Sequence, residues 1–162
     1  MAGFAVLGVG NSLMTDDGFG VHALRHFRAN STDPEIDCLD AGTVGLALMT
    51  RLGGLDGLIA VDAMRLDKPP GTLTVLEGDA MDVHLRKHHG SVHELGLSDI
   101  MDALRLADDL PAHRALVGIE PEWIDWGTEP SAVVAARIPD AVDAIHSLIR
   151  GWKQELLKES AA

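Results

Sequence analysis

The sequence predicts an α/β fold around a mostly parallel sheet of five strands, and two observations carry that prediction. Short apolar runs, glycine-rich turns and segments with apolar residues at helical spacing follow one another along the 162 residues, which is typical of strands that alternate with helices. The first run, Phe4 to Val9, is continuously apolar, as expected for a strand buried on both faces. Because no repeat, linker or low-complexity segment interrupts this order, we expect one domain over residues 1–162.

The first half of the chain holds three of the predicted strands. Apolar residues at helical spacing after Gly18 predict the first helix. The second helix is expected to end at Gly53-Gly54, a common helix stop. The third strand is apolar until its last residue, Asp62. The elements expected here are a strand at 4–9, a helix burying Val21, Leu24 and Phe27, a strand at 35–40, a turn at 41–45 that leads into a helix running to about 52, and a strand at 58–62.

The second half adds two strands and two longer helices. A loop by composition, 67–71, precedes a strand with β-branched alternation at 72–76. The basic cluster Arg86-Lys87-His88-His89 is expected to lie in a solvated loop. A helix at 95–105, a strand at 115–119 and a last helix from Pro139 to about 157 follow. The apolar residues that the two helices should bury are Leu97, Ile100, Met101, Leu104, Val142, Ile145, Ile149 and Leu156.

Composition excludes several classes of protein. The net charge of −12 disfavours binding to nucleic acid, which selects clustered positive charge. The single cysteine, Cys38, rules out an internal disulfide framework. The first residues lack a basic signal-peptide region, and no stretch is apolar for the roughly 18 residues that a membrane span needs. We therefore expect a cytoplasmic protein without membrane or nucleic-acid partners.

Motifs of common enzyme classes fail in detail. The glycines after the first strand miss the dinucleotide fingerprint, because Leu13 stands at the third glycine position and two carboxylates follow where a pyrophosphate would bind. The phosphate loop and the Gly-x-Ser-x-Gly nucleophile motif are absent, and Cys38 lies inside a predicted strand. His93 begins a zinc-protease motif whose second histidine is replaced by Leu97.

Three polar residues remain at the edge of the sheet where ligands of such folds bind. Asp17 follows the first strand, Asp62 ends the third, and His93 stands before a helix. Carboxylates and imidazole suit zinc or nickel, and three protein ligands leave positions open for substrate. Each residue can instead cap a helix or form a turn. His22 and His26 have metal-binding spacing but are expected on the polar face of a helix.

Several motifs, each weak alone, occur together in an order that resembles the hydrogenase maturation proteases, the endopeptidases of the nickel–iron hydrogenase pathway. The likeness covers nearly the whole chain. The motifs are Gly8-Val9-Gly10-Asn11, Asp16-Asp17-Gly18-Phe19-Gly20, Asp40-Ala41-Gly42-Thr43, Val61-Asp62-Ala63, Pro70-Gly71-Thr72, His93-Glu94-Leu95-Gly96-Leu97 and Gly118-Ile119-Glu120-Pro121-Glu122.

This resemblance implies a three-layer, phosphorylase/hydrolase-like α/β/α fold and an endopeptidase that removes a short C-terminal extension from the hydrogenase large-subunit precursor. It places the family's metal contacts on Asp17, Asp62 and His93. Asp17 stands where well-known relatives carry glutamate and is one methylene shorter. The resemblance implies that the nickel comes with the precursor and marks it as ready, with zinc or another divalent cation as surrogate. The residues given a structural or substrate-orienting role are Asn11, Asp40, Gly42 and Thr43.

Several alternatives stay open on the sequence. Asp17 and Asp62 can each be a metal ligand or the general base of an aspartyl-type endopeptidase. A self-contained metallopeptidase, a maturation peptidase for another metalloenzyme and a non-enzymatic checkpoint module are the other functions considered. We expect a monomer. Trp123 and Trp126 either anchor the partner or cover the core. The loops expected to set specificity are 66–70, 79–92 and 123–130.

Overall fold

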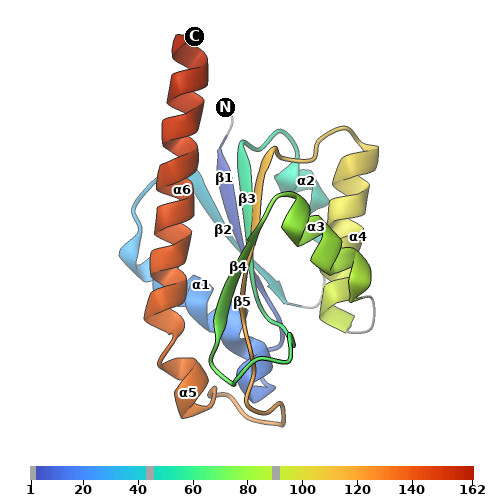
Figure 1. Ribbon diagram of the computed structural model, residues 1–162, viewed down its shortest axis with the longest axis vertical. Coiled ribbons are helices and arrows are strands. Elements are labelled where there is room, and N and C mark those ends of the chain that lie inside the picture. The colour runs from blue at the N-terminus through green and yellow to red at the C-terminus, as the bar shows by residue number, and fades with distance from the viewer. Residues whose placement is uncertain (1–2, 43–45, 89–91) are drawn as a thin grey trace.

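One five-stranded sheet forms the middle of the molecule (Figure 1). The computed structural model describes residues 3–42, 46–88 and 92–162, although the side chains of 46 and 92–95 lie outside that description. The strand order is β2-β1-β3-β5-β4, in which β4 alone runs antiparallel to its neighbour. The predicted mostly parallel sheet is confirmed. The strands are β1 (Phe4–Val9), β2 (Ile36–Gly42), β3 (Gly57–Ala63), β4 (Leu73–Glu77) and β5 (His113–Ile119).

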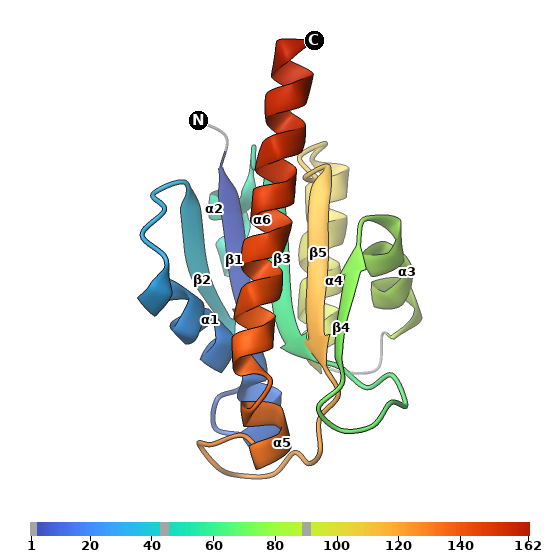
Figure 2. The same ribbon diagram turned by 60° about the vertical axis from the view of Figure 1, so that its left-hand side comes forward.

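Helices cover both faces of this sheet (Figures 1 and 2). On one face, α1 (Phe19–Asn30) and α6 (Ile138–Ala161) enclose one hydrophobic cluster with the strands. On the other face, α2 (Met49–Leu52), α3 (Asp79–Lys87) and α4 (Val92–Leu106) enclose a second cluster. The predicted α/β/α layering is therefore confirmed. Three short elements complete the order: the 3₁₀ helices η1 (Thr15–Gly18) and η2 (Leu46–Leu48), and α5 (Ala132–Ala135).

The helices bury the faces that their periodicity predicts. The apolar residues predicted for α1 are at most 3% exposed, and those predicted for α4 at most 2%. In α6, Ile145 and Ile149 are buried, while Val142 and Leu156 pack against the cluster from partly buried positions. Cys38, inside β2, is half-buried. Apolar periodicity thus fixes which side of each helix faces the sheet.

Two predicted segments differ from the structure. The turn predicted at 41–45 starts too early, because β2 continues to Gly42, whereas the helix predicted after it is present as η2 and α2 and ends at Leu52 as expected. Gly42 ends the strand with φ +47°, a conformation that favours glycine. The basic cluster predicted in a loop begins inside α3, whose buried Met81 and Leu85 stand at helical spacing. Arg86 and Lys87 are exposed in its last turn, where positive charge suits the helix dipole.

The carboxyl ends of the four parallel strands and the first turn of α4 lie at one edge of the sheet, which is the lower edge in Figure 1. At this carboxyl edge, α1 packs directly on the strands. A Cβ atom on Gly20 would lie 2.0 Å from the carbonyl oxygen of Val61 and 2.4 Å from that of Val9. This close approach brings η1, the turn that carries Asp17, against the ends of β1 and β3. Among the described helices, none combines the length and hydrophobicity that a membrane span requires.

Candidate active site

Asp17 lies in η1, directly after the loop that leaves β1. Its side chain is buried, and its Oδ2 accepts a hydrogen bond of 2.9 Å from the backbone N–H of Asn11. The backbone N–H of Asp17 donates to the carbonyl of Met14 at 3.0 Å. The loop therefore folds back on itself and uses a backbone amide to hold the carboxylate. This arrangement fixes the position of the carboxylate.

Asp62 approaches the same loop from β3. It is 3% exposed and pairs in register with Gly118 of β5. Gly10, which has φ +118°, lies between the backbone of Asp17 and the side chain of Asp62. A Cβ atom on Gly10 would lie 3.5 Å from Asp62 Oδ1 and only 2.0 Å from the carbonyl oxygen of Asp17. Glycine at this position is thus required for the turn and for the close approach of the Asp17 backbone.

The other predicted site residues lie around this pair. Asp40 Oδ1 accepts a hydrogen bond from Gly42 N at 3.0 Å, and the Gly42 carbonyl accepts one from Gly10 N at 3.2 Å. The end of β2 is thereby joined to the loop of Asp17. Thr43 lies outside the described residues. His93 is the second residue of α4, at the same edge, and its side chain lies outside the described part of the chain.

Asp16 has a structural role that the sequence did not predict. Its carboxylate is fully buried and accepts four hydrogen bonds from the loop after β5. The donors are Glu122 N at 2.8 Å, Trp123 N at 3.1 Å, Ser131 N at 2.6 Å and Ser131 Oγ at 2.9 Å. Asp16 therefore locks the loop after β5 onto η1. The Asp-Asp pair was visible in the sequence, but nothing local distinguishes its two members.

Thr15 and Glu120 strengthen this framework. Thr15 Oγ1 donates to the Trp123 carbonyl at 3.1 Å and accepts from Asp125 N at 3.0 Å. Glu120 is 7% exposed, and its Oε2 accepts from Leu66 N at 2.7 Å, which ties the loop after β3 to the end of β5. The loops that surround the two aspartates are thus fastened to one another by buried polar groups.

His22 joins α1 to the same loops. Its Nε2 is buried, makes no hydrogen bond within the described residues, and lies 3.4 Å from the position of a Cβ on Gly18. Burial, followed by the positive charge of Arg25, lowers the pKa of His22, whereas Glu129 and a hydrogen bond to the Thr128 backbone act in the opposite direction. His22 was expected on the polar face of its helix, and the structure places it against the active-site loop instead.

The donor set at the carboxyl edge suits a hard or borderline cation that brings ligands of its own. Asp17 and Asp62 supply carboxylate oxygens from two different elements. Among the side chains that the structure describes, no three His, Cys, Asp or Glu are placed to hold a metal ion together.

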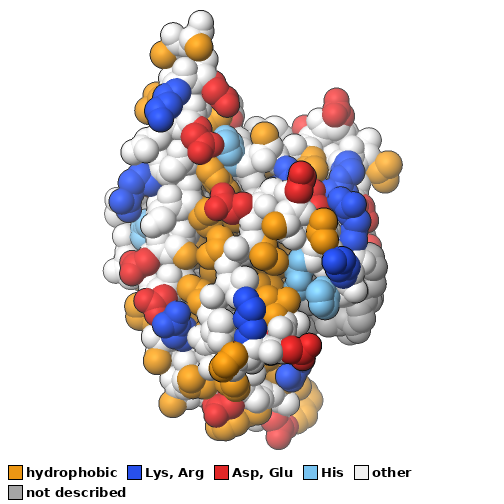
Figure 3. Space-filling model, in the orientation of Figure 1, with side chains coloured by type: hydrophobic (Ala, Val, Ile, Leu, Met, Phe, Trp, Pro, Cys, Tyr) orange, Lys and Arg blue, Asp and Glu red, His pale blue; other side chains and the backbone are white. Residues whose placement is uncertain are grey.

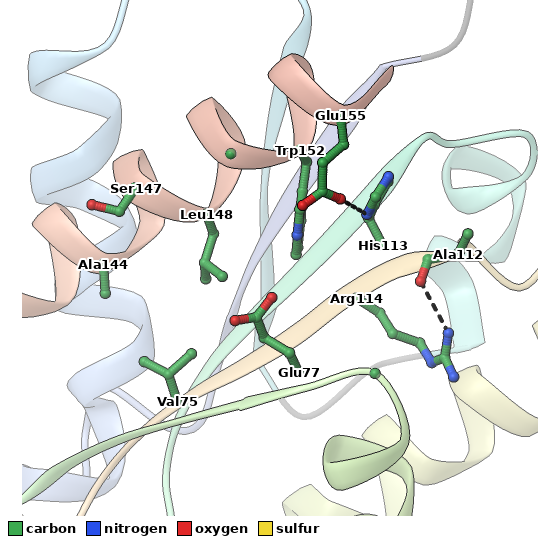
Figure 4. Close-up of a pocket in the computed structure, with 12 residues that line it drawn as sticks. Val75, Glu77, Ala112, His113, Arg114, Ala144, Ser147, Leu148, Trp152 and Glu155 are labelled. Carbon is green, nitrogen blue, oxygen red and sulfur yellow. Dashed lines mark hydrogen bonds and ion pairs between the residues drawn. The ribbon is translucent and has the colours of Figure 1, made fainter. Parts of the chain in front are cut away.

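A separate cavity of about 580 Å³ lies on the α6 side of the β4–β5 pair (Figure 4). Its lining includes Val75, Glu77, His113, Leu148 and Trp152, and it contains none of the predicted site residues. We call it the α6 groove. Its size alone gives it no chemistry, so the carboxyl edge remains the candidate active site.

Comparisons with known proteins agree on one family. A sequence model described as hydrogenase maturation protease matches residues 21–148. The chain is 34% identical over 149 residues to the hydrogenase expression/formation protein HupD of Rhizobium leguminosarum bv. viciae, covering 91% of this chain and 74% of that protein. It is 33% identical over 158 residues to the hydrogenase 2 maturation protease of Escherichia coli K12, covering 96% of each.

Solved structures agree with the sequence matches. The hydrogenase maturating endopeptidase HybD from E. coli has a TM-score of 0.86 with this fold at 30% identity, covering 92% of this chain and 93% of that one. A hydrogenase 2 maturation peptidase from the Thaumarchaeota archaeon SCGC_AB-539-E09 has a TM-score of 0.69 at 31% identity, covering 91% and 97%.

Proposed function

Because the chain belongs to the hydrogenase maturation protease family, we propose that it removes a C-terminal extension from the nickel-loaded large-subunit precursor of a nickel–iron hydrogenase. The family predicted from the sequence motifs is confirmed, and the protein is an endopeptidase of hydrogenase maturation. Nickel enters this proposal as part of the substrate. The proposed enzyme is monomeric and acts in the cytoplasm.

The observation that carries the nickel proposal is that the Asp62 side chain and the backbone of Asp17 both border Gly10, which places the two aspartates on adjoining segments of the carboxyl edge. Two carboxylates beside a cation stay ionised, and both approach from rigid surroundings. The remaining coordination positions are left for cysteine ligands of the precursor and for His93 at the start of α4. In this arrangement, the enzyme recognises a metal that its substrate already holds.

The enzyme's own residues then position the bond that is cut. Asn11 N–H orients the Asp17 carboxylate, and β3 holds Asp62 beside it. A precursor-bound cation can act as a Lewis acid that polarises the scissile carbonyl. Of the two carboxylates, one binds the metal and the other accepts a proton from the attacking water and passes it to the amine that leaves when the C–N bond breaks. An asparagine retains an oxygen donor but accepts no proton, so Asp→Asn and Asp→Ala variants separate the two roles.

The test uses purified precursor from the same organism, loaded with nickel or free of it, and follows its mass. We expect the wild type to shorten only the loaded form. Of Asp17→Asn and Asp62→Asn, the variant that removes the general base should slow cleavage by roughly 100-fold or more, and the variant that keeps an oxygen donor to the metal should slow it less. His93→Ala should also slow cleavage, because it removes a proposed metal ligand. Asp109→Asn is the matched control, because Asp109 is exposed in the α4–β5 connection at the opposite edge.

Two results would overturn the proposal. Undiminished cleavage by all three variants would contradict the roles assigned to Asp17, Asp62 and His93. Equal cleavage of nickel-free precursor would contradict a requirement for nickel. Metal analysis of the isolated enzyme adds a further check. A tightly bound stoichiometric ion in the absence of precursor would identify a self-contained metallopeptidase.

A further inference from the structure

A ridge of exposed apolar side chains stands on the loops beside Asp17. Leu13 and Trp123 are each 53% exposed and Trp126 is 78% exposed, whereas Trp152 in α6 is 5% exposed. We call Leu13, Trp123 and Trp126 the indole ridge. Figure 3 shows hydrophobic side chains gathered at this lower end of the molecule. Of the nine large hydrophobic side chains exposed in the described part of the chain, five belong to these loops and to α5: Leu13, Trp123, Ile124, Trp126 and Val133.

The indole ridge is held in place by the buried groups under it. Gly127 N donates to the Leu13 carbonyl at 2.9 Å, and Thr15 N donates to the Gly127 carbonyl at 2.9 Å. Asp16 accepts the amide of Trp123 and is next in sequence to Asp17. A surface ordered before binding loses little conformational freedom when a partner arrives. Exposed indoles on a rigid loop are typical anchors of protein interfaces.

The charged residues of the loop that carries the two indoles are all acidic. Glu122, Asp125 and Glu129 are exposed between or beside the indoles, and residues 120–131 contain no lysine or arginine. A cation close to such carboxylates is attracted by them and also by the faces of the indole rings. The surface therefore favours an apolar segment that carries positive charge.

We propose that the indole ridge binds an apolar segment of the precursor that carries lysine or arginine and lies beside the bond that is cut. This inference rests on the proposed function. An endopeptidase must hold a polypeptide across its active site, and the ridge shares its loops with Asp17. The indole ridge supplies affinity for the substrate, while the two aspartates supply the chemistry.

The test compares Trp126→Ala with the wild type in two measurements on nickel-loaded precursor, the dissociation constant and the cleavage kinetics. We expect KM and the dissociation constant to rise about tenfold or more, as for an interface anchor, with kcat within about twofold of the wild type. Trp126→Phe should recover most of the affinity. Leu157→Ala is the matched control, because Leu157 is 71% exposed on α6, away from the site.

The role of the negative charge beside the indole ridge is tested by replacing a glutamate with lysine. Glu122→Lys should weaken precursor binding, and added salt should weaken binding to the wild type. Glu159→Lys near the end of α6 makes the same change of charge and should have little effect.

The outcomes separate the two proposals. Unchanged affinity in both Trp126→Ala and Glu122→Lys overturns the indole ridge, even if the wild type cleaves the precursor normally. A wild type that binds the precursor through Trp126 but leaves its mass unchanged overturns the proposed function and supports the ridge. A wild type that neither binds nor cleaves overturns both.

Discussion

The carboxyl edge of the sheet and the α6 groove hold their charged and aromatic residues in opposite ways. At the groove, His113 Nδ1 lies 3.7 Å from Glu155 Oε2, and Arg114, which lines the groove, donates hydrogen bonds of 3.0 and 2.8 Å to Asp82 of α3, the helix that covers the other face of the sheet. Trp152 is buried, with its ring 5.5 Å from that of His113. At the carboxyl edge, buried carboxylates accept hydrogen bonds from backbone amides, and the tryptophans are exposed.

This difference sets the two regions apart electrostatically. A carboxylate paired with arginine forms a neutral unit that has little attraction for a cation. A carboxylate that accepts hydrogen bonds from backbone amides, as Asp16 and Asp17 do, is equally fixed in position. The metal site that we propose uses carboxylates of this second kind. At the α6 groove, His113 and Trp152 instead join β5 to α6.

Replacing Trp152 gives the largest expected effect and tests whether the groove is structural. Trp152→Ala should lower the free energy of unfolding by about 3–5 kcal/mol, the usual cost of removing a large buried aromatic side chain. Cleavage per folded molecule should not change. Trp126→Ala should lie within about 0.5 kcal/mol of the wild type. Urea unfolding measures both variants, and equal losses of stability would break the contrast between the two regions.

Removing the acid of the Arg114 pair should come next in size. Asp82→Asn leaves Arg114 nearly buried and without its charge partner, so the free energy of unfolding should fall by about 3 kcal/mol. Asp79→Asn is the control. Asp79 contacts the same guanidinium at 3.5 Å but is fully exposed, so its loss should have little effect. Comparable destabilisation by the two variants would contradict a buried pair.

The same pair predicts a response to acid. Burial alone would raise the pKa of Asp82, but hydrogen bonds and charge from Arg114 hold that pKa below its ordinary value. The pair's stabilisation is therefore complete above about pH 4 and is lost as the pH falls through the lowered pKa. Acid unfolding of Asp82→Asn should lack this component.

Adding one methyl group at the carboxyl edge should affect cleavage more than folding. Gly10→Ala places a Cβ 2.0 Å from the Asp17 carbonyl oxygen, so the loop must shift and carry the carboxylate with it. Misplacement by about 1 Å can reduce the rate about 100-fold, which corresponds to about 2.7 kcal/mol. Gly151→Ala in α6 is the control, since its added Cβ meets no atom within 4 Å. A normal kcat/KM in Gly10→Ala would contradict the proposal that this loop positions Asp17 for cleavage.

The sequence predicted what depends on local pattern and on the topology of the fold. Strands and buried helix faces follow from periodicity, and the placement of Asp17 and Asp62 at one edge of the sheet follows from the shared edge of the strand ends. The sequence did not predict that Asp16 binds the loop after β5 whereas Asp17 binds the amide of Asn11. The partners of Asp16 lie more than 100 residues away along the chain, so the difference between two adjacent aspartates exists only in the folded molecule. Helix α3 was not predicted, because its two buried apolar residues, Met81 and Leu85, stand beside a cluster of exposed basic residues that is typical of a loop.

The smallest expected effect concerns the pH response of the carboxyl edge through His22. Because burial lowers its pKa, the folded protein takes up a proton at His22 less readily than the unfolded chain does. Its contribution to stability is therefore complete above about pH 6.5 and is lost as the pH falls below that value. His22→Gln should flatten the dependence of the unfolding free energy on pH between about 7.5 and 5, whereas His26→Gln, at an exposed position one turn further along α1, should preserve it. An unchanged slope in His22→Gln would show that the loops around Asp17 do not depend on a neutral imidazole.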